Sequence, residues 1–168
     1  MDPLAPLRLR SARLLGREAG RADRPALQAC LEAGADYFEL VEGAPPAPDA
    51  AERLLDEAEA DPLRRVLLLQ AAGRAAPLGC LDLWLDQPEP GTAHVGLLLV
   101  AGALRHQGYG AEATGALEQA LGAAGYVCLR LSVTDENPGA RAFWERVGFA
   151  EVGRLEDGVT VLEKVLGR

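Results

Sequence analysis

The sequence predicts a mixed α/β (α+β) fold, with one domain over residues 1–168 and a mainly antiparallel central sheet of about seven strands flanked by about four helices. Strand-like and helix-like stretches alternate along the whole chain, and no linker is long enough to divide it. The middle of the chain carries three successive strand patterns joined by turn residues, which indicates an antiparallel meander. Of the 168 residues, 49% are hydrophobic, which is enough for one ordinary core.

The first third of the chain predicts one strand followed by helices. Apolar and polar residues alternate from Leu7 towards Leu15, as in a strand with one buried face. Asp23 is in position to cap a helix over residues 24–32, which has proline in its first turn. A short helical turn is expected at 36–41. Residues 49–60 place apolar side chains on one face and acidic ones on the other, so they predict an amphipathic helix.

The middle of the chain predicts three neighbouring strands. Val66–Gln70 and Leu78–Leu85 are apolar runs separated by a polar, glycine-containing connection, which is typical of a hairpin. The sequence QPEPG at 87–91 then turns the chain into Ala93–Val100. We expect these strands to pair antiparallel in their order along the chain.

The last third alternates helix and strand. Small and apolar residues recur at helical spacing over 111–124, and the apolar run Val127–Val133 follows as a strand. The pair Asn137-Pro138 is a typical helix start, and Gly148 ends that helix. The chain finishes with a predicted hairpin of Phe149–Leu155 and Val159–Leu166.

Charge and composition argue against several classes of protein. Lys and Arg number 17 against 25 Asp and Glu, and the net charge of -8 argues against nucleic-acid binding, which needs clustered cations. The longest uncharged apolar stretch, Val95–Leu104, has about ten residues against the roughly 20 of a membrane helix, so no membrane association is expected. The first residues lack an export-signal pattern. Three separated cysteines suit a reduced, cytoplasmic protein, and two isolated histidines form no metal-binding pattern.

A glycine-rich segment, Arg105–Ala111 (RHQGYGA), lies between the strand at 93–100 and the helix at 111–124. A turn of this kind directs several backbone N–H groups outwards, and the helix dipole adds about half a positive charge at the same place. Gly108 and Gly110 let a ligand approach the backbone without a Cβ in the way. The segment therefore predicts a phosphate-binding loop, although glycines at such a junction also suit a plain structural turn.

Two motifs together carry a resemblance to a known family. RHQGYG resembles the Q/R-x-x-G-x-G/A pyrophosphate-binding motif of the GNAT superfamily, the acetyl-CoA-dependent N-acetyltransferases. Further along, NPGARAFWERVGF at 137–149 resembles the N-x-x-A-x-x-F-Y-x-x-x-G-F segment of the same family. Each motif lies on the expected element, and the order of elements over nearly the whole chain is similar. The resemblance is strongest over 93–149 and architectural before it.

The resemblance implies where acetyl-CoA (coenzyme A) binds. In this family the fourth strand, here 93–100, is splayed from the fifth, here 127–133, and the pantetheine arm lies in the gap. Backbone groups around Leu98, Leu99 and Val100 would pair with the arm and stabilise the thioester oxyanion. The pyrophosphate would be held by the loop residues Arg105, His106, Gln107, Gly108, Tyr109, Gly110 and Ala111. The opposite wall would contribute Asn137, Phe143 and Trp144. The asparagine also suits a simple helix cap, and the two aromatic residues also suit the core.

The catalytic residues are less clearly marked. Trp144 stands where many family members have a tyrosine that protonates the departing thiolate, and an indole N–H is no useful proton donor. His94, near the start of the strand beside the cofactor, has an ordinary pKa that suits a base taking a proton from the amine, although a partly exposed strand histidine is the simpler interpretation. Glu39 and Glu42, in the region that walls the acceptor side in this family, are further candidates for the base. Leu99 is the candidate for contact with the oxyanion.

We therefore expect direct transfer of an acetyl group from acetyl-CoA to a primary amine of a small molecule or peptide, by a monomer or homodimer. Nine acidic residues against one arginine lie from Asp36 to Asp61, which predicts attraction of a cationic amine. Those of the 49–60 helix also suit a solvated face.

Two alternatives stay open at this point. A noncatalytic acyl-CoA-binding or regulatory module would keep the phosphate loop and lack an acceptor pocket, and Trp144 favours it. The spacing Gly108-x-Gly110-x-x-Ala113 also satisfies a dinucleotide-binding fingerprint. Dinucleotide folds, however, continue through several parallel strand–helix units, whereas one helix and a hairpin are expected here.

Overall fold

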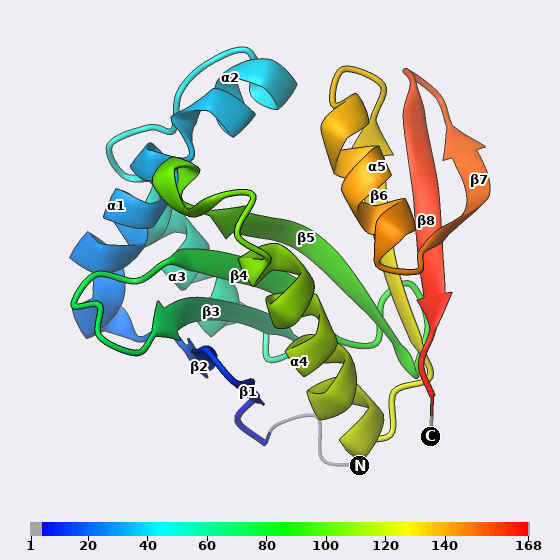
Figure 1. The fold of residues 1–168 in the computed structure, drawn as a ribbon, viewed down its shortest axis with the longest axis horizontal. Helices are drawn as coiled ribbons and strands as arrows, with labels where there is room; N and C mark the ends of the chain where they lie inside the picture. Colours follow the sequence, from blue (N-terminus) through cyan, green and yellow to red (C-terminus); the bar gives the residue numbers. More distant parts are fainter. Residues whose placement is uncertain (1–4, 168) are drawn as a thin grey trace.

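A computed structural model describes residues 5–167 of the chain (Figure 1). Its strands are β1 (Arg8–Arg10), β2 (Leu14–Glu18), β3 (Arg64–Ala71), β4 (Gly79–Trp84), β5 (Thr92–Val100), β6 (Cys128–Thr134), β7 (Ala150–Leu155) and β8 (Val159–Val165). Its α-helices are α1 (Arg24–Ala33), α2 (Ala35–Glu42), α3 (Ala50–Ala60), α4 (Tyr109–Ala123) and α5 (Pro138–Arg146).

The described strands form one sheet in the order β1-β2-β3-β4-β5-β6-β8-β7. All neighbouring pairs are antiparallel except β5 and β6, which run parallel. The mixed α/β class, the meander β3–β4–β5 and the terminal hairpin β7–β8 are confirmed. The strand count exceeds the expected seven by one, and five α-helices replace the expected four because the turn at 36–41 extends into the helix α2.

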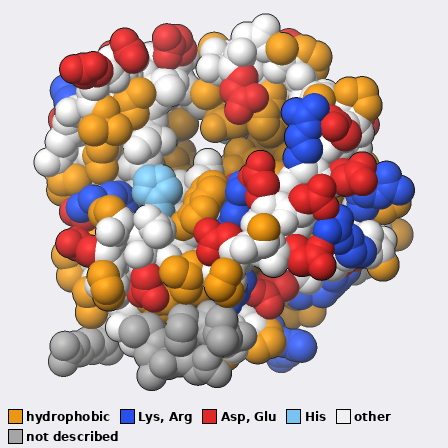
Figure 2. Space-filling model, turned by 180° about the vertical axis from the view of Figure 1, so that it is seen from behind, with side chains coloured by type: hydrophobic (Ala, Val, Ile, Leu, Met, Phe, Trp, Pro, Cys, Tyr) orange, Lys and Arg blue, Asp and Glu red, His pale blue; other side chains and the backbone are white. Residues whose placement is uncertain are grey.

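At one end of the sheet, helix α2 lies on one side and α5 with the ends of β6 and β8 lies on the other (Figure 1). The space-filling view from behind shows a notch between two lobes of the surface at this end (Figure 2). Within the described residues, no helix is both long and apolar enough to cross a membrane.

The first predicted strand is in fact a hairpin of two strands, β1 and β2, so the expectation of one continuous strand is wrong. The backbone N–H of Ser11 donates to the carbonyl of Leu14 at 3.0 Å, and the Ser11 Oγ accepts from the Leu14 N–H at 3.2 Å. A serine that bonds the backbone nearby closes a tight turn. Beyond this turn the alternation changes phase, because Leu14 is buried and Leu15 is half exposed.

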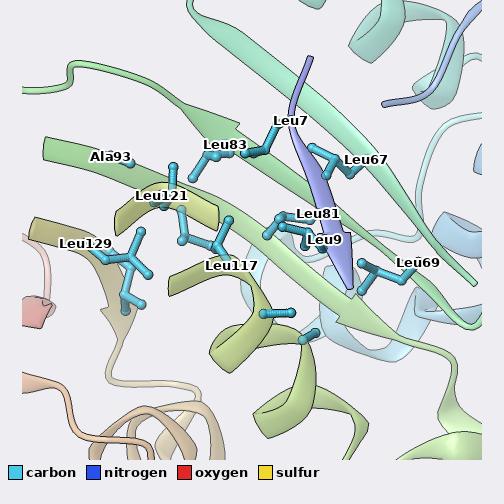
Figure 3. Close-up of a cluster of buried hydrophobic side chains, with 14 of the residues drawn as sticks. Leu7, Leu9, Leu67, Leu69, Leu81, Leu83, Ala93, Leu117, Leu121 and Leu129 are labelled. Atoms are coloured by element: carbon cyan, nitrogen blue, oxygen red, sulfur yellow. The ribbon is translucent and has the colours of Figure 1, made fainter. Parts of the chain in front are cut away.

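Two clusters of hydrophobic side chains hold the sheet between the helices. Leu67 and Leu69 of β3 pack under α4 in one cluster, together with leucines of β4 and of α4 itself (Figure 3). Leu68 of the same strand points the other way and packs under α1 and α3. β3 and β4 are therefore buried on both faces, which gives the functional end of the sheet a rigid base.

Of the two helix caps predicted from the sequence, the structure confirms the one at α5 and not the one at α1. The Asn137 Oδ1 accepts from the Ala140 N–H at 3.1 Å, which confirms the predicted cap of α5. Asp23 makes no such bond at α1, so that expectation is wrong. A 3-10 turn at Arg21–Asp23 precedes α1, and the Asp23 carboxylate instead accepts from the Gly20 N–H at 2.8 Å and from Arg17.

Candidate active site

The site begins where β5 and β6 separate. Thr92–Val95 pair with Cys128–Leu131, whereas Leu97–Val100 pair only with β4 (Figure 1). At the point of separation Gly96 has no partner in β4, because Val95 faces Leu83 and Leu97 faces Asp82. A Cβ on Gly96 would lie 2.2 Å from the ring of Trp84, so this bulge needs glycine. The splayed pair of strands that the resemblance implied is therefore confirmed.

A cleft of about 880 Å³ follows the separated strands from α2 to α5. The predicted cofactor residues line it, except one: Leu98, Leu99, Val100, Arg105, His106, Gly108, Tyr109, Gly110, Ala111, Asn137, Phe143 and Trp144. The exception is Gln107, whose Nε2 donates to the Ala103 carbonyl at 3.2 Å and whose side chain is exposed. The fold thus brings together residues that lie far apart in the sequence.

The segment 105–111, which we call the phosphate loop, presents a row of free donors. Within the described residues, the backbone N–H groups of 106–111 have no acceptor, and the first return bond runs from the Glu112 N–H to the Gly108 carbonyl at 3.0 Å. His106 and Gly108 have left-handed backbones, with φ of 62° and 83°. Successive N–H groups in a turn that opens a helix form an anion cradle. The loop therefore fits a pyrophosphate.

Glycine at position 110 keeps this cradle open. A Cβ placed there would lie 3.2 Å from the Cζ of Phe143, which is tighter than most real Cβ contacts. Phe143 comes from α5 and lines the cleft opposite the loop. Any larger side chain at Gly110 would therefore occupy the space between the two walls.

The second half of β5 offers backbone groups to the cleft. The Ala101 N–H donates to the Leu78 carbonyl at 2.8 Å, so the backbone groups of Ala101 face β4. Because successive residues of a strand turn their N–H and carbonyl groups to opposite sides, those of Leu98 and Val100 face away from β4 and towards the cleft. The Val100 carbonyl indeed accepts from the Arg105 Nε at 3.1 Å. Leu99 has a side chain that is 3% exposed and packs in the cluster under α1.

Arg105 ties the phosphate loop to α2. Both terminal nitrogens of its guanidinium bond the carboxylate of Asp36, one of them at 2.9 Å. This pairing holds the pKa of Asp36 below its usual value. Because the Nε is bonded to Val100, every nitrogen of the Arg105 side chain has a protein partner.

Trp144 belongs to the core as well as to the cleft wall. Its side chain is 8% exposed and lies edge-on between Phe143, at 4.9 Å between ring centres, and Phe149, at 5.1 Å. A ring packed in this way is a structural wall, and its indole supplies no proton.

The structure places the candidate bases away from the cleft lining. His94 lies in the paired half of β5, opposite Trp84 and Arg130, with 6.5 Å between its ring centre and that of Trp84. Burial, together with the charge of Arg130, lowers the pKa of His94. Glu39 and Glu42 are exposed on α2, on the side that does not line the cleft.

Tyr37 and Arg146 are among the cleft residues that the sequence analysis did not single out. Tyr37 lines the cleft from α2, and burial, helped by the charge of Glu42, raises its pKa. Arg146 lines the cleft from the end of α5 and is exposed. Arg146 lies inside the second motif and could have been found there, whereas no local pattern marks Tyr37.

The acidic region between Asp36 and Asp61 is largely neutralised by arginines. Five of its carboxylates form ion pairs: those of Asp36, Asp49, Asp56, Glu57 and Glu59. Within the described part of the chain, Glu39, Glu42, Glu52 and Asp61 have no such partner. Of these four, Glu39 and Glu42 lie on α2, the helix that borders the cleft, so any attraction of a cation to the cleft rests mainly on α2.

Comparison with known proteins decides the family. The model of the acetyltransferase (GNAT) family matches residues 27–149. This chain belongs to the GNAT acetyltransferase family. An acetyltransferase from Thermus thermophilus is 30% identical, with 91% of this chain and 97% of that chain covered and a TM-score of 0.82.

Two further acetyltransferase structures show the same fold at lower identity. Spermidine N-acetyltransferase from Vibrio cholerae, in complex with CoA and spermine, is 17% identical over 93% of this chain and 97% of that chain, with a TM-score of 0.75. The ribosomal-protein-S18-alanine N-acetyltransferase from Escherichia coli is 18% identical over 92% and 95%, with a TM-score of 0.68. Membership of this family assigns acetyl-CoA to the chain as its cofactor. The family match and the single parallel strand pair among the described strands overturn the dinucleotide-binding alternative.

Proposed function

We propose that this GNAT protein transfers an acetyl group from acetyl-CoA directly to a primary amine of a small molecule or peptide. The gap between β5 and β6 carries the proposal, because it joins the anion cradle of the phosphate loop to the point where the sheet opens at Gly96. The names of the neighbouring enzymes support an amine acceptor, since one acts on spermidine and another on an alanine of a ribosomal protein.

The chain's own groups suit each part of the cofactor. The free N–H groups of 106–111 would hold the pyrophosphate, and the cleft-facing backbone groups of Leu98 and Val100 would bond the amide-containing arm or the thioester oxygen. Phe143 would pack against the arm from the other wall. Acetyl-CoA, when bound, supplies the acetyl group as an activated thioester. No acid is required at Trp144, because a thiol with a pKa of about 8.5 is a tolerable leaving group as thiolate.

We propose His94 as the proton acceptor, acting through water because its side chain does not line the cleft. Its lowered pKa keeps the imidazole neutral at pH 7, which is the form a base needs. It lies two residues before the bulge at Gly96, on the same strand as the cleft-facing backbone groups. Glu39 and Glu42 would favour a cationic amine near α2, and weaker binding of such an amine at high salt would test this.

Titration calorimetry of the purified protein with acetyl-CoA, with NAD as the control, is the first test. Binding of acetyl-CoA alone supports the site, and a panel of small amines and peptide N-termini is then screened by release of the CoA thiol. Turnover with a primary amine would support the proposal. Binding of NAD in preference to acetyl-CoA would contradict it.

The packing of Trp144 favours a second candidate, a noncatalytic acyl-CoA-binding module. Because this tryptophan fills the position of the usual tyrosine and is buried between two phenylalanines, the site lacks that proton donor. The module would bind acetyl-CoA as tightly as an enzyme and release no thiol with any amine of the panel.

A further inference from the structure

The turn between β1 and β2 is fastened to the start of α4. Glu112, in the first turn of α4, accepts from the Ser11 Oγ at 2.7 Å, from the Arg13 backbone N–H at 2.8 Å and from the Arg13 Nε at 2.6 Å. Burial alone would raise the pKa of Glu112, but these hydrogen bonds outweigh it and hold the pKa below its usual value. The turn is therefore part of the wall around the phosphate loop, although nothing in the two family motifs points to it.

The guanidinium of Arg13 lies against the phosphate loop itself. Its Cζ is 4.3 Å from the ring centre of Tyr109, and its Nη2 donates to the Gln107 carbonyl at 3.0 Å. The same Nη2 is 3.2 Å from the place where a Cβ on Gly108 would stand. Within the described residues, Nη1 makes no hydrogen bond, and the side chain is 46% exposed. Arg13 is thus held in one orientation and keeps an unused donor edge.

The two arginines that flank the loop differ in what they have left to offer. Arg105 uses its terminal nitrogens on Asp36 and its Nε on Val100. Arg13 uses its Nε and one hydrogen of Nη2. A prealigned arginine with free N–H groups is the side chain best suited to a phosphate. Arg105, the cation of the motif, is therefore bonded to Asp36 of α2, and Arg13, from the turn between β1 and β2, is a second cation beside the loop.

Coenzyme A carries a pyrophosphate and a further phosphate on the 3′-hydroxyl of its adenosine. The free backbone N–H groups of 106–111 would hold the pyrophosphate, as proposed above. Arg13 does not line the cleft and lies beside Gly108, at its outer margin. We propose that Arg13 binds the 3′-phosphate of coenzyme A and so makes the protein prefer coenzyme A to its 3′-dephospho form. This proposal rests on acetyl-CoA as the cofactor and is independent of the acceptor.

Calorimetry with CoA and with 3′-dephospho-CoA tests the proposal without any turnover. We expect the unaltered protein to bind CoA about tenfold more tightly than 3′-dephospho-CoA. Arg13→Gln is expected to weaken CoA binding by about tenfold and to leave 3′-dephospho-CoA binding within about twofold, which also shows that the variant is folded. Arg13→Lys keeps the charge but loses the planar guanidinium, so its affinity for CoA should lie between those of the unaltered protein and of Arg13→Gln.

Arg17→Gln is the matched control. It removes the same charge from the neighbouring strand β2, where Arg17 is 44% exposed and pairs with Asp23. This variant should keep the full preference for CoA. If Arg13→Gln lost affinity for CoA and for 3′-dephospho-CoA equally, the proposal would be overturned. It would also be overturned if Arg146→Gln lost the preference for CoA and Arg13→Gln kept it. Failure of the unaltered protein to bind either molecule would contradict the acetyl-CoA site itself, and this inference with it.

Discussion

The two halves of β5 differ in what lies on their β6 side. Thr92–Val95 are hydrogen-bonded to β6 there, and the side chains of Ala93 and Val95 are buried in the cluster under α4. Gly96–Val100 have β4 on one side and the cleft on the other, and the backbone of Val100 bonds a side chain instead of a strand. One strand therefore contributes to stability in its first half and offers ligand-binding groups in its second.

The difference shows how an open sheet edge is tolerated inside a fold. Unpaired strand groups are a liability unless something covers or uses them. Here the buried first half fixes the direction of the strand, and the bulge at Gly96 turns the second half away from β6. Substitutions should therefore separate into those that destabilise the protein and those that only weaken binding.

The largest effect is expected in the paired half. Leu129 of β6 lies opposite Ala93, is fully buried, and packs with leucines of α4 (Figure 3). Leu129→Ala should lower the free energy of unfolding by about 2–5 kcal/mol, because it leaves a cavity. Urea denaturation measures this, with Leu155→Ala, at a leucine that is 60% exposed, as the control. Acetyl-CoA binding by the folded variant should be unchanged, and a large loss of affinity would break the comparison.

The next effect concerns binding rather than stability. Gly110→Leu puts a branched side chain between the phosphate loop and Phe143, at a motif position that takes glycine or alanine, and should weaken acetyl-CoA binding by about tenfold in calorimetry. Gly115→Leu, on the same helix but with nothing within 4 Å of the new Cβ, is the control. It should raise the unfolding free energy by about 0.5 kcal/mol and leave binding unchanged. Equal affinities in the two variants would show that the cradle does not hold the cofactor.

A smaller effect, of opposite sign, is expected at the α2 wall. Asp36→Asn removes a carboxylate beside the phosphate loop and frees Arg105 from its ion pair. Affinity for the anionic acetyl-CoA should rise by about two- to fivefold at low salt and by less at high salt. Asp49→Asn is the control. It also breaks an exposed ion pair, with Arg53, but lies away from the cleft, so the affinity for acetyl-CoA should be unchanged. Weaker binding in Asp36→Asn would mean that the ion pair is needed to shape the loop.

The smallest effect is a pH dependence at the junction of the two halves. Burial and Arg130 lower the pKa of His94 in the folded protein, so the folded state favours the neutral imidazole. This contribution to stability is present above the ordinary histidine pKa of about 6.5 and is lost as the pH falls through the lowered value. Measured by urea unfolding, the free energy of unfolding should change less between pH 7.5 and pH 5.5 in His94→Gln than in the unaltered protein. If His94 is the base, the acidic limb of the rate profile should also disappear, and a limb that persists would exclude it.

Much of the fold was predictable because its signals are local. The turn residues of the β3–β4–β5 meander, the Asn137 cap and the glycines of the phosphate loop each act within a few residues. The hairpin of β1 and β2 was missed because its turn depends on one hydroxyl of Ser11, which leaves the hydrophobic pattern looking continuous. Leu99 shows a further limit, since the backbone groups of adjacent strand residues face opposite ways. Only the observed pairing with β4 decides that Leu98 and Val100, rather than Leu99, turn their N–H and carbonyl groups to the cleft.

The sequence by itself determined the class of fold and the family, and it placed the glycine-rich loop before a helix, because periodicity and motif spacing are properties of short segments. Only the tertiary structure decided which charges meet at the loop. Arg13 and Glu112 are 99 residues apart, and Asp36 and Arg105 are 69 apart. Contacts over such distances arise when the sheet and helices pack, because the buried leucines set the positions of the elements that carry these charges.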